Sequence, residues 1–333
     1  MATLGPNKLN LLDWAKRLDP DGKTAAIVEL LALENGILMD IPFKEGNLPT
    51  GHRVSVRTGL PEVYWRQLNQ GVQPSKSTTA QIDEGCAMLE AWSEVDVKLA
   101  KLNGNEAAFR LSEARAFLEA MAIEHASTMF YGNSSASPEE FNGLAIRYSS
   151  TSAANGQNII KAGGSDPADN ASIWLVGWGE NSVHGIFPKG SKAGIEHKDL
   201  GAQTVENAGG VTGAKMLAYR DLFQLDTGIV LKDWRYVSRV ANIDVSALVA
   251  EASDADLTKH MIKAMHRIHN LSVVKPMFYM NRTVFQYLDI QRRDDVKGAG
   301  MRYDEVDGKL IPSFRGIPIK ICDSLLDTEA AIS

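Results

Sequence analysis

The chain has 333 residues, 44% of them hydrophobic and 23% charged, so it can bury a large core in one domain or two. Its 35 Lys and Arg against 41 Asp and Glu give a formal net charge of −6, which excludes a general electrostatic footprint for nucleic acid or an anionic membrane. The only cysteines, Cys86 and Cys322, are far apart and exclude a disulfide framework and a zinc cluster. Because the chain has no signal-peptide pattern and no apolar run near the ~18 residues of a membrane span, we expect neither secretion nor membrane insertion.

The beginning of the chain predicts two short amphipathic helices. Residues 7–18 have apolar side chains at helical spacing before Pro20, and residues 24–33 form a similar segment before Asn35 and Gly36.

The segment from Pro42 to Gly85 predicts a long extended hairpin. It has strand-like alternation over 53–57 and a polar stretch over 70–81. Such a segment buries little of itself, and loops of this length inside compact domains are uncommon unless they have a function. We therefore expect it to lie on another subunit.

On this hairpin, alternation places the two arginines of 53–57 on one face and two valines on the other. The polar face is expected to meet acidic groups of a neighbour, although solvated charges on an edge strand also protect against aggregation, and this alternative stays open. The residues that we expect at the subunit interface are Arg53, Arg57, Tyr64, Trp65 and Arg66.

A long helix is predicted from Asn105 to Tyr131, because apolar residues recur there at steps of three and four. Asn105 fits a cap and Gly132 a stop. The helix would run about 40 Å, and Met121 on its apolar stripe should face the subunit's own core.

The rest of the chain predicts short strands and helices without regular βαβ alternation, so the expected fold class is α+β. We expect a strand pair over 172–178 and 183–187 turning at 179–181, strands over 218–224 and 234–240 joined at 226–228, a helix over 256–269, a strand over 276–279, a helix beginning over 282–288 and a last strand over 317–321.

No motif for chemistry emerges. His260, His266 and His269 lie on one predicted helix, but their spacing of six and three does not form a metal site. The segment 187–194 superficially resembles a phosphate-binding loop, but Ser191 stands where that motif requires a lysine, so the motif is not met. We expect no enzyme activity, no cofactor and no metal.

The order of arm, hairpin, long helix and mixed α+β region resembles the Hong Kong phage capsid fold over nearly the whole chain. Several stretches also resemble the major capsid proteins of short-tailed bacteriophages, namely 172–179, 185–191, 233–237 and 277–282. The resemblance implies a structural subunit of the virion capsid, assembled in the host cytoplasm into an icosahedral shell of hexamers and pentamers around double-stranded DNA.

Mapped on this resemblance, the chain divides into the parts of a capsid subunit. They are the N-terminal arm at 1–40, the extended loop at 41–97, the peripheral domain at 98–140 and 214–252 with the spine helix at 105–131, the axial domain at 141–213 and 253–308, and a C-terminal strand and tail at 309–333.

The resemblance implies a portal and a separate scaffolding protein as partners, and no sequence-specific contact with DNA. Some relatives link subunits through a lysine and an asparagine, but no local motif commits Lys44 or Lys76 to that chemistry. We therefore expect non-covalent locking, with a cement protein as a further partner. Two alternatives stay open at this point: an encapsulin-like compartment shell and a soluble oligomeric enzyme.

Overall fold

The computed structural model describes residues 35–102, 106–206, 212–250, 256–294, 301–306 and 309–332. Helices and strands mix there without regular βαβ alternation, so the predicted α+β class is confirmed. The two predicted N-terminal helices lie outside the described residues, as does most of the predicted arm. None of the helices in the described part is long and apolar enough to cross a membrane.

The chain folds into two compact units. The first contains the described residues of Met88–His125 and Gly194–Asp226, and the second those of Glu34–Ala87, Ala126–Ala193 and Thr227–Ser333. These limits differ from those predicted for the peripheral and axial domains, and the domain names stay predictions.

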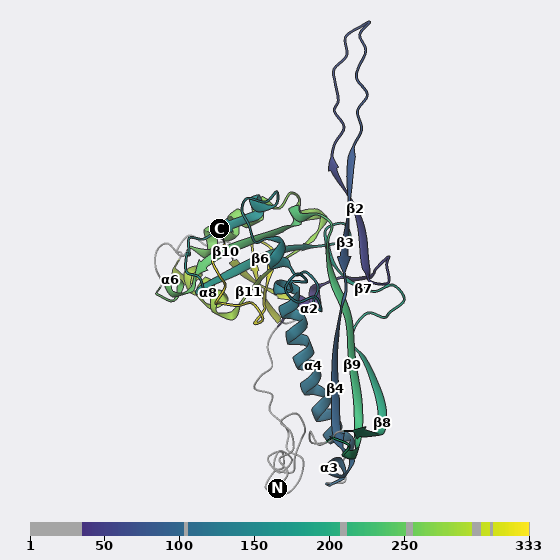
Figure 1. Cartoon of the computed structure of the whole chain (residues 1–333). Helices are drawn as coiled ribbons and strands as arrows, with labels where there is room; N and C mark the ends of the chain where they lie inside the picture. Colours follow the sequence, from purple (N-terminus) through teal and green to yellow (C-terminus); the bar gives the residue numbers. More distant parts are fainter. Residues whose placement is uncertain are drawn as a thin grey trace. The chain divides into compact units, whose positions relative to one another are not determined.

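In the first unit, a long helix packs against three strands of a sheet that has 12 strands in the described part of the chain (Figure 1). The helix α4 (Glu106–Tyr131) confirms the helix predicted over 105–131. Met121 lies on the buried side of α4 and packs against Phe223 and Leu225, as expected. The three strands are β9 (Lys215–Leu231) and its neighbours β8 (Glu196–Glu206) and β4 (Ala87–Asp96), and the short helix α3 (Val97–Lys101) follows β4.

The second unit is built around a sheet whose central strand is β6 (Asn170–Trp178). All nine residues of β6 are buried, because one hydrophobic core lies on each face of the sheet. On one side β6 is followed by β11 (Lys275–Met280), β14 (Ile317–Ile321), β13 (Lys309–Phe314) and β12 (Met301–Val306), and on the other by β10 (Val237–Asp244) and β5 (Ile159–Lys161).

Short helices cover both faces of this sheet. The buried face of α7 (Leu257–Arg267) packs into the same core as α6 (Val245–Val249) and α8 (Arg282–Asp294). The other core receives the last residues of α4 together with α2 (Ile37–Asp40) and α5 (Leu144–Arg147). The 3-10 turns are η1 (Gly156–Asn158), η3 (Trp234–Tyr236) and η4 (Leu271–Val273).

A separate two-stranded sheet forms the predicted hairpin. β2 (Gly51–Gly59) pairs antiparallel with β3 (Thr78–Gly85), so the hairpin is shorter than the expected loop at 41–97. Figure 1 shows the chain continuing beyond these strands as two extended segments that meet at a tip. Residues 60–77 are called the hairpin tip below.

The strand pair predicted over 172–187 is wrong as a hairpin, although both strands exist. β6 and β7 (Val183–Phe187) meet only at one parallel bridge, between Trp178 and Val183. β6 pairs antiparallel with β10 and β11 instead, and β7 lies between β9 and β1 (Phe43–Glu45). Because β10 and β11 occupy the two edges of β6, no edge is free for a local hairpin with β7.

The turn predicted at 226–228 is also wrong, because β9 passes through these residues without a break. A β-carbon on Gly228 would stand 2.7 Å from the carbonyl oxygen of Gly85. The glycine therefore allows close approach of two backbones and does not mark a turn. β9 ends at Leu231 and η3 follows it, so β10 begins at Val237 rather than at Trp234.

Candidate subunit interface

The base of the hairpin packs on other strands of the second unit through one face of β2. Val54 is buried and Val56 is half-buried, in a small cluster with Ile186 and Val230. The arginines of β2 lie on the opposite, exposed face, so the predicted alternation is confirmed.

Arg53 has its ionic partner within the hairpin itself. Its Nε and a terminal nitrogen donate to the two carboxylate oxygens of Asp83 at 2.6 and 2.7 Å. This hydrogen-bonded guanidinium lowers the pKa of Asp83. Arg57 forms no ion pair within the described residues, so it is the arginine of β2 whose charge is left for a neighbour.

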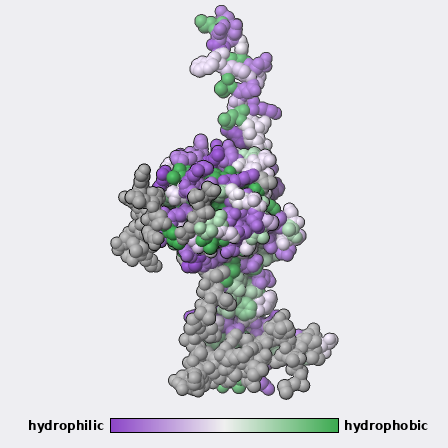
Figure 2. All heavy atoms as spheres, turned by 90° about the vertical axis from the view of Figure 1, so that its left-hand side faces the viewer, coloured by the Kyte–Doolittle hydropathy of each residue, from purple (hydrophilic) through white to green (hydrophobic). Residues whose placement is uncertain are grey.

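The hairpin tip exposes large apolar side chains that nothing in the described part of the chain covers. Trp65 is fully exposed, and Val63 and Leu68 are each 89% exposed. In Figure 2 hydrophobic and hydrophilic spheres alternate along the hairpin at the top of the view. Exposed apolar side chains gathered on one element mark interaction sites. The predicted residues Tyr64 and Arg66 lie on the same tip, and both are exposed.

The tip is held together by short-range polar contacts. The Ser75 hydroxyl donates to the carbonyl oxygen of Glu62 at 2.6 Å, and the Tyr64 hydroxyl donates to the Glu62 carboxylate. Thr58 and Thr78 are hydrogen-bonded at 3.1 Å where the ladder ends. The Ser75 and Thr58 contacts join the two arms of the hairpin, and the Tyr64 contact lies within one arm.

A buried ion pair fixes the base of β3. Both terminal nitrogens of Arg147 on α5 donate to the carboxylate of Glu84, the second at 2.7 Å. Arg147 also donates to the carbonyl oxygens of Asn142 and Gly143, at 3.1 and 3.2 Å. The side chains of Arg147 and Glu84 are 17% and 7% exposed. Because water screens this pair less than the exposed pair of Arg53 and Asp83, it contributes more to holding the hairpin base in place.

Glu84→Gln is expected to lower the free energy of unfolding by about 3–5 kcal/mol, because it leaves the Arg147 guanidinium buried without a charged partner. Asp83→Asn is a matched control on the adjacent residue, and it should change stability little because its ion pair is exposed. Urea unfolding of both variants measures the difference. Equal losses in the two variants would show that Glu84 is no special anchor.

Two histidines meet where the hairpin base contacts β7. The rings of His52 and His184 are 5.9 Å apart, edge to face. The pKa of His184 is lowered to about 4, mainly by burial and also by the nearby Lys232, His52 and Lys44, against the opposing effect of Glu180. Burial and Lys232 also lower the pKa of His52. Both rings are therefore neutral at pH 7.

The free energy of unfolding should fall as the pH falls from about 6.5 to about 4. In this range the unfolded chain binds a proton at position 184 that the folded chain does not, so acid favours unfolding. His184→Gln should reduce the difference between urea unfolding at pH 7 and at pH 5. His266→Gln, at an exposed position, should leave that difference unchanged, and an unaltered pH dependence in His184→Gln would contradict the assignment.

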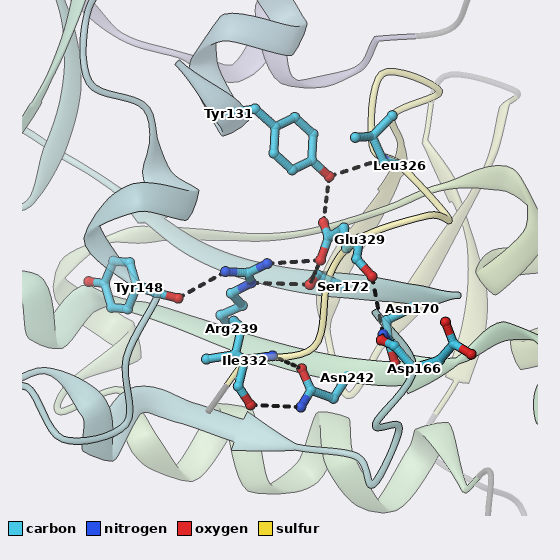
Figure 3. A network of polar contacts seen from close by, with 10 residues as sticks. All are labelled: Tyr131, Tyr148, Asp166, Asn170, Ser172, Arg239, Asn242, Leu326, Glu329 and Ile332. Carbon is cyan, nitrogen blue, oxygen red and sulfur yellow. Dashed lines mark hydrogen bonds and ion pairs between the residues drawn. The ribbon is translucent and has the colours of Figure 1, made fainter. Parts of the chain in front are cut away.

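A buried polar network secures the C-terminal segment to the sheet (Figure 3). Arg239 donates to Glu329 at 2.8 Å, to the Ser172 hydroxyl at 3.1 Å and to the carbonyl oxygen of Tyr148 at 2.9 Å. The Tyr131 hydroxyl also donates to Glu329, and burial together with this carboxylate raises the pKa of Tyr131.

The end of the segment is held by Asn242, which stands in the left-handed region at φ 59 beside an irregularity in β10. Its amide donates to the carbonyl oxygen of Ile332 at 3.0 Å and accepts from the Ile332 backbone N–H at 2.8 Å. Since Ser172, Arg239 and Glu329 are all buried and bonded to one another, the network holds the fold and offers no group to a substrate.

The histidines weighed as metal ligands do not converge. His260 lies on the buried side of α7, whereas His266 and His269 are exposed. Across the described ranges, no three His, Cys, Asp or Glu side chains gather where they could hold a metal ion.

A family model described as major capsid protein GP7 matches residues 19–333. The chain belongs to this family of major capsid proteins. No curated protein sequence matches it. A chain in the near-atomic-resolution structure of bacteriophage Epsilon15 is 33% identical, with a TM-score of 0.78 over 100% of this chain and 99% of that one. A chain of the bacteriophage JBD30 capsid, 8% identical, has a TM-score of 0.52 over 91% of this chain and 96% of that one, and shows likeness of fold alone.

These matches confirm the predicted phage capsid fold and the identity as a capsid subunit. They leave the five expected interface residues untested. On this capsid protein the five residues lie on one hairpin, Arg53 and Arg57 on β2 and the other three on the tip. The sequence analysis did not include the apolar neighbours of Trp65, which are Leu60, Val63 and Leu68. Their recurrence within a polar segment was the pattern that could have identified them.

Proposed function

We propose that this capsid protein assembles into an icosahedral shell of hexamers and pentamers around double-stranded phage DNA. The observation that carries the proposal is the hairpin tip, whose exposed apolar side chains have no cover in the described part of their own subunit. A second copy of the chain can cover these side chains by presenting a different part of its surface to them. Such heterologous contacts between copies close into rings. The membership in a major capsid family supports the same assembly.

On this proposal, the tip residues Tyr64, Trp65 and Arg66 contact a neighbouring subunit, and Arg57 faces its acidic groups. The tip bears Arg66 and Lys76 against Glu62, so acidic groups on the neighbour would complement it. A scaffolding protein, a portal and a cement protein are proposed as partners, with assembly in the host cytoplasm. Locking is non-covalent.

Electron microscopy of the purified protein tests the assembly. We expect closed particles at high protein concentration, with the scaffolding protein co-expressed where the subunit alone stays unassembled. Sedimentation velocity should give species of megadalton size. A small, stable oligomer under all these conditions would overturn the proposal.

A further inference from the structure

One face of α7 carries only basic residues among its charged side chains. Lys259, Lys263, His266 and Arg267 are all exposed, at positions i, i+4, i+7 and i+8 of the helix. The opposite side of α7 is buried in the core of the second unit. These four residues are called the basic face below.

Within the described residues, no ion pair neutralises the basic face. Residues 257–270 contain no Asp or Glu, and within the described residues no carboxylate lies within salt-bridge distance of Lys259, Lys263 or Arg267. The subunit elsewhere pairs most of its described arginines with a carboxylate: Arg53, Arg110, Arg147, Arg220, Arg235, Arg239 and Arg282.

Such a face does not stabilise the subunit. Like charges at i and i+4 on a helix repel each other, and a helix that only needs solubility carries both signs. An unpaired cationic row on a chain with a net charge of −6 therefore points to an anionic partner outside the subunit.

The chemistry of the face favours nucleic acid over protein. Protein interfaces centre on apolar and aromatic anchors and are depleted of charge. The basic face has no such anchor, because Ile262 and Met265 on its borders pack against the core. Interfaces with DNA are polar and strongly positive, which matches the face.

We propose that the basic face of α7 binds the phosphate backbone of the packaged DNA without regard to sequence, and that α7 therefore faces the interior of the shell. The inference rests on the proposed function. The three permanent cations, Lys259, Lys263 and Arg267, span about 12 Å along the helix. About three phosphates fit that length, which gives weak binding per subunit that is repeated over the shell.

The test uses the unassembled full-length subunit and a fluorescent 20-base-pair duplex, followed by anisotropy from low to moderate salt. The triple variant K259Q/K263Q/R267Q should weaken binding at least tenfold, and it should flatten the plot of log affinity against log salt by about 2.7. The matched control K98Q/K101Q/K192Q removes the same charge from exposed lysines outside the hairpin and the basic face, and it should bind like the wild type.

The inference is overturned by absent binding of the wild type at the lowest salt, or by equal losses in the two variants. It is also overturned if polyglutamate competes as strongly as DNA, since the partner would then be an acidic protein. Shell formation is scored separately by electron microscopy. The proposed function can thus fail while the DNA result stands, and the reverse.

Discussion

Glu329→Gln is expected to lower the free energy of unfolding by about 3–5 kcal/mol, the cost of breaking a buried ion pair from one side. The side chains of Glu329 and Arg239 are each 5% exposed, so water does not reach the guanidinium once its partner is neutral. Domains are stable by only about 5–15 kcal/mol, and we therefore expect most of the variant to be insoluble.

The measurement is the yield of soluble protein together with the urea midpoint of what remains. Asp327→Asn is the matched control, because it makes the same chemical change two residues away at an exposed position. It should behave like the wild type. If both variants lose stability equally, the C-terminal segment matters as a whole and the ion pair does not.

The elements that could be predicted from the sequence are those fixed by local patterns. α4 follows from apolar residues at helical spacing, and α7 from the same spacing after the capping Asp256, whose side chain accepts from the backbone N–H of Lys259. The hairpin could be predicted because alternation and turn residues lie within one segment. Each signal lies within one continuous segment and does not depend on distant neighbours.

The features that could not be predicted depend on residues far apart in the chain. β6 was expected to pair with the next strand, but its edges are taken by β10 and β11, whose paired residues come 61 to 105 positions later. Gly228 looks like a turn residue until the backbone of Gly85 is placed against it. A local pattern carries no information on which distant backbone approaches a glycine.

The two buried ion pairs illustrate the same limit for the candidate site. Glu84 and Arg147 are separated by 63 residues, and Arg239 and Glu329 by 90. Each residue alone resembles a solvated surface charge, and only the fold shows that the pair is buried. The exposure of the five expected interface residues was easier to predict, because exposure on an extended segment needs no distant partner.

Trp65→Ala is expected to block assembly while the subunit stays folded. The indole is fully exposed in the subunit, so its removal opens no cavity and breaks no internal contact of the core. In an interface, by contrast, tryptophan is among the residues whose truncation costs most, commonly a loss of about 30-fold or more in the association constant. Since every subunit of a shell would use the same contact, we expect the protein concentration needed for assembly to rise by at least that factor.

Sedimentation velocity at increasing protein concentration measures the assembly threshold, and circular dichroism with thermal unfolding reports the fold. Val273→Ala is the matched control, since Val273 is an apolar side chain, 68% exposed, on η4 and outside the hairpin. It should assemble at the wild-type concentration. Arg57→Glu tests the charge of the hairpin in the same way and should also raise the threshold, because it reverses the one cation of β2 that has no partner in the hairpin. Normal shells from Trp65→Ala at the wild-type threshold would mean that the hairpin tip does not form the contact between subunits, and unfolding of the variant would mean that the tip belongs to the core.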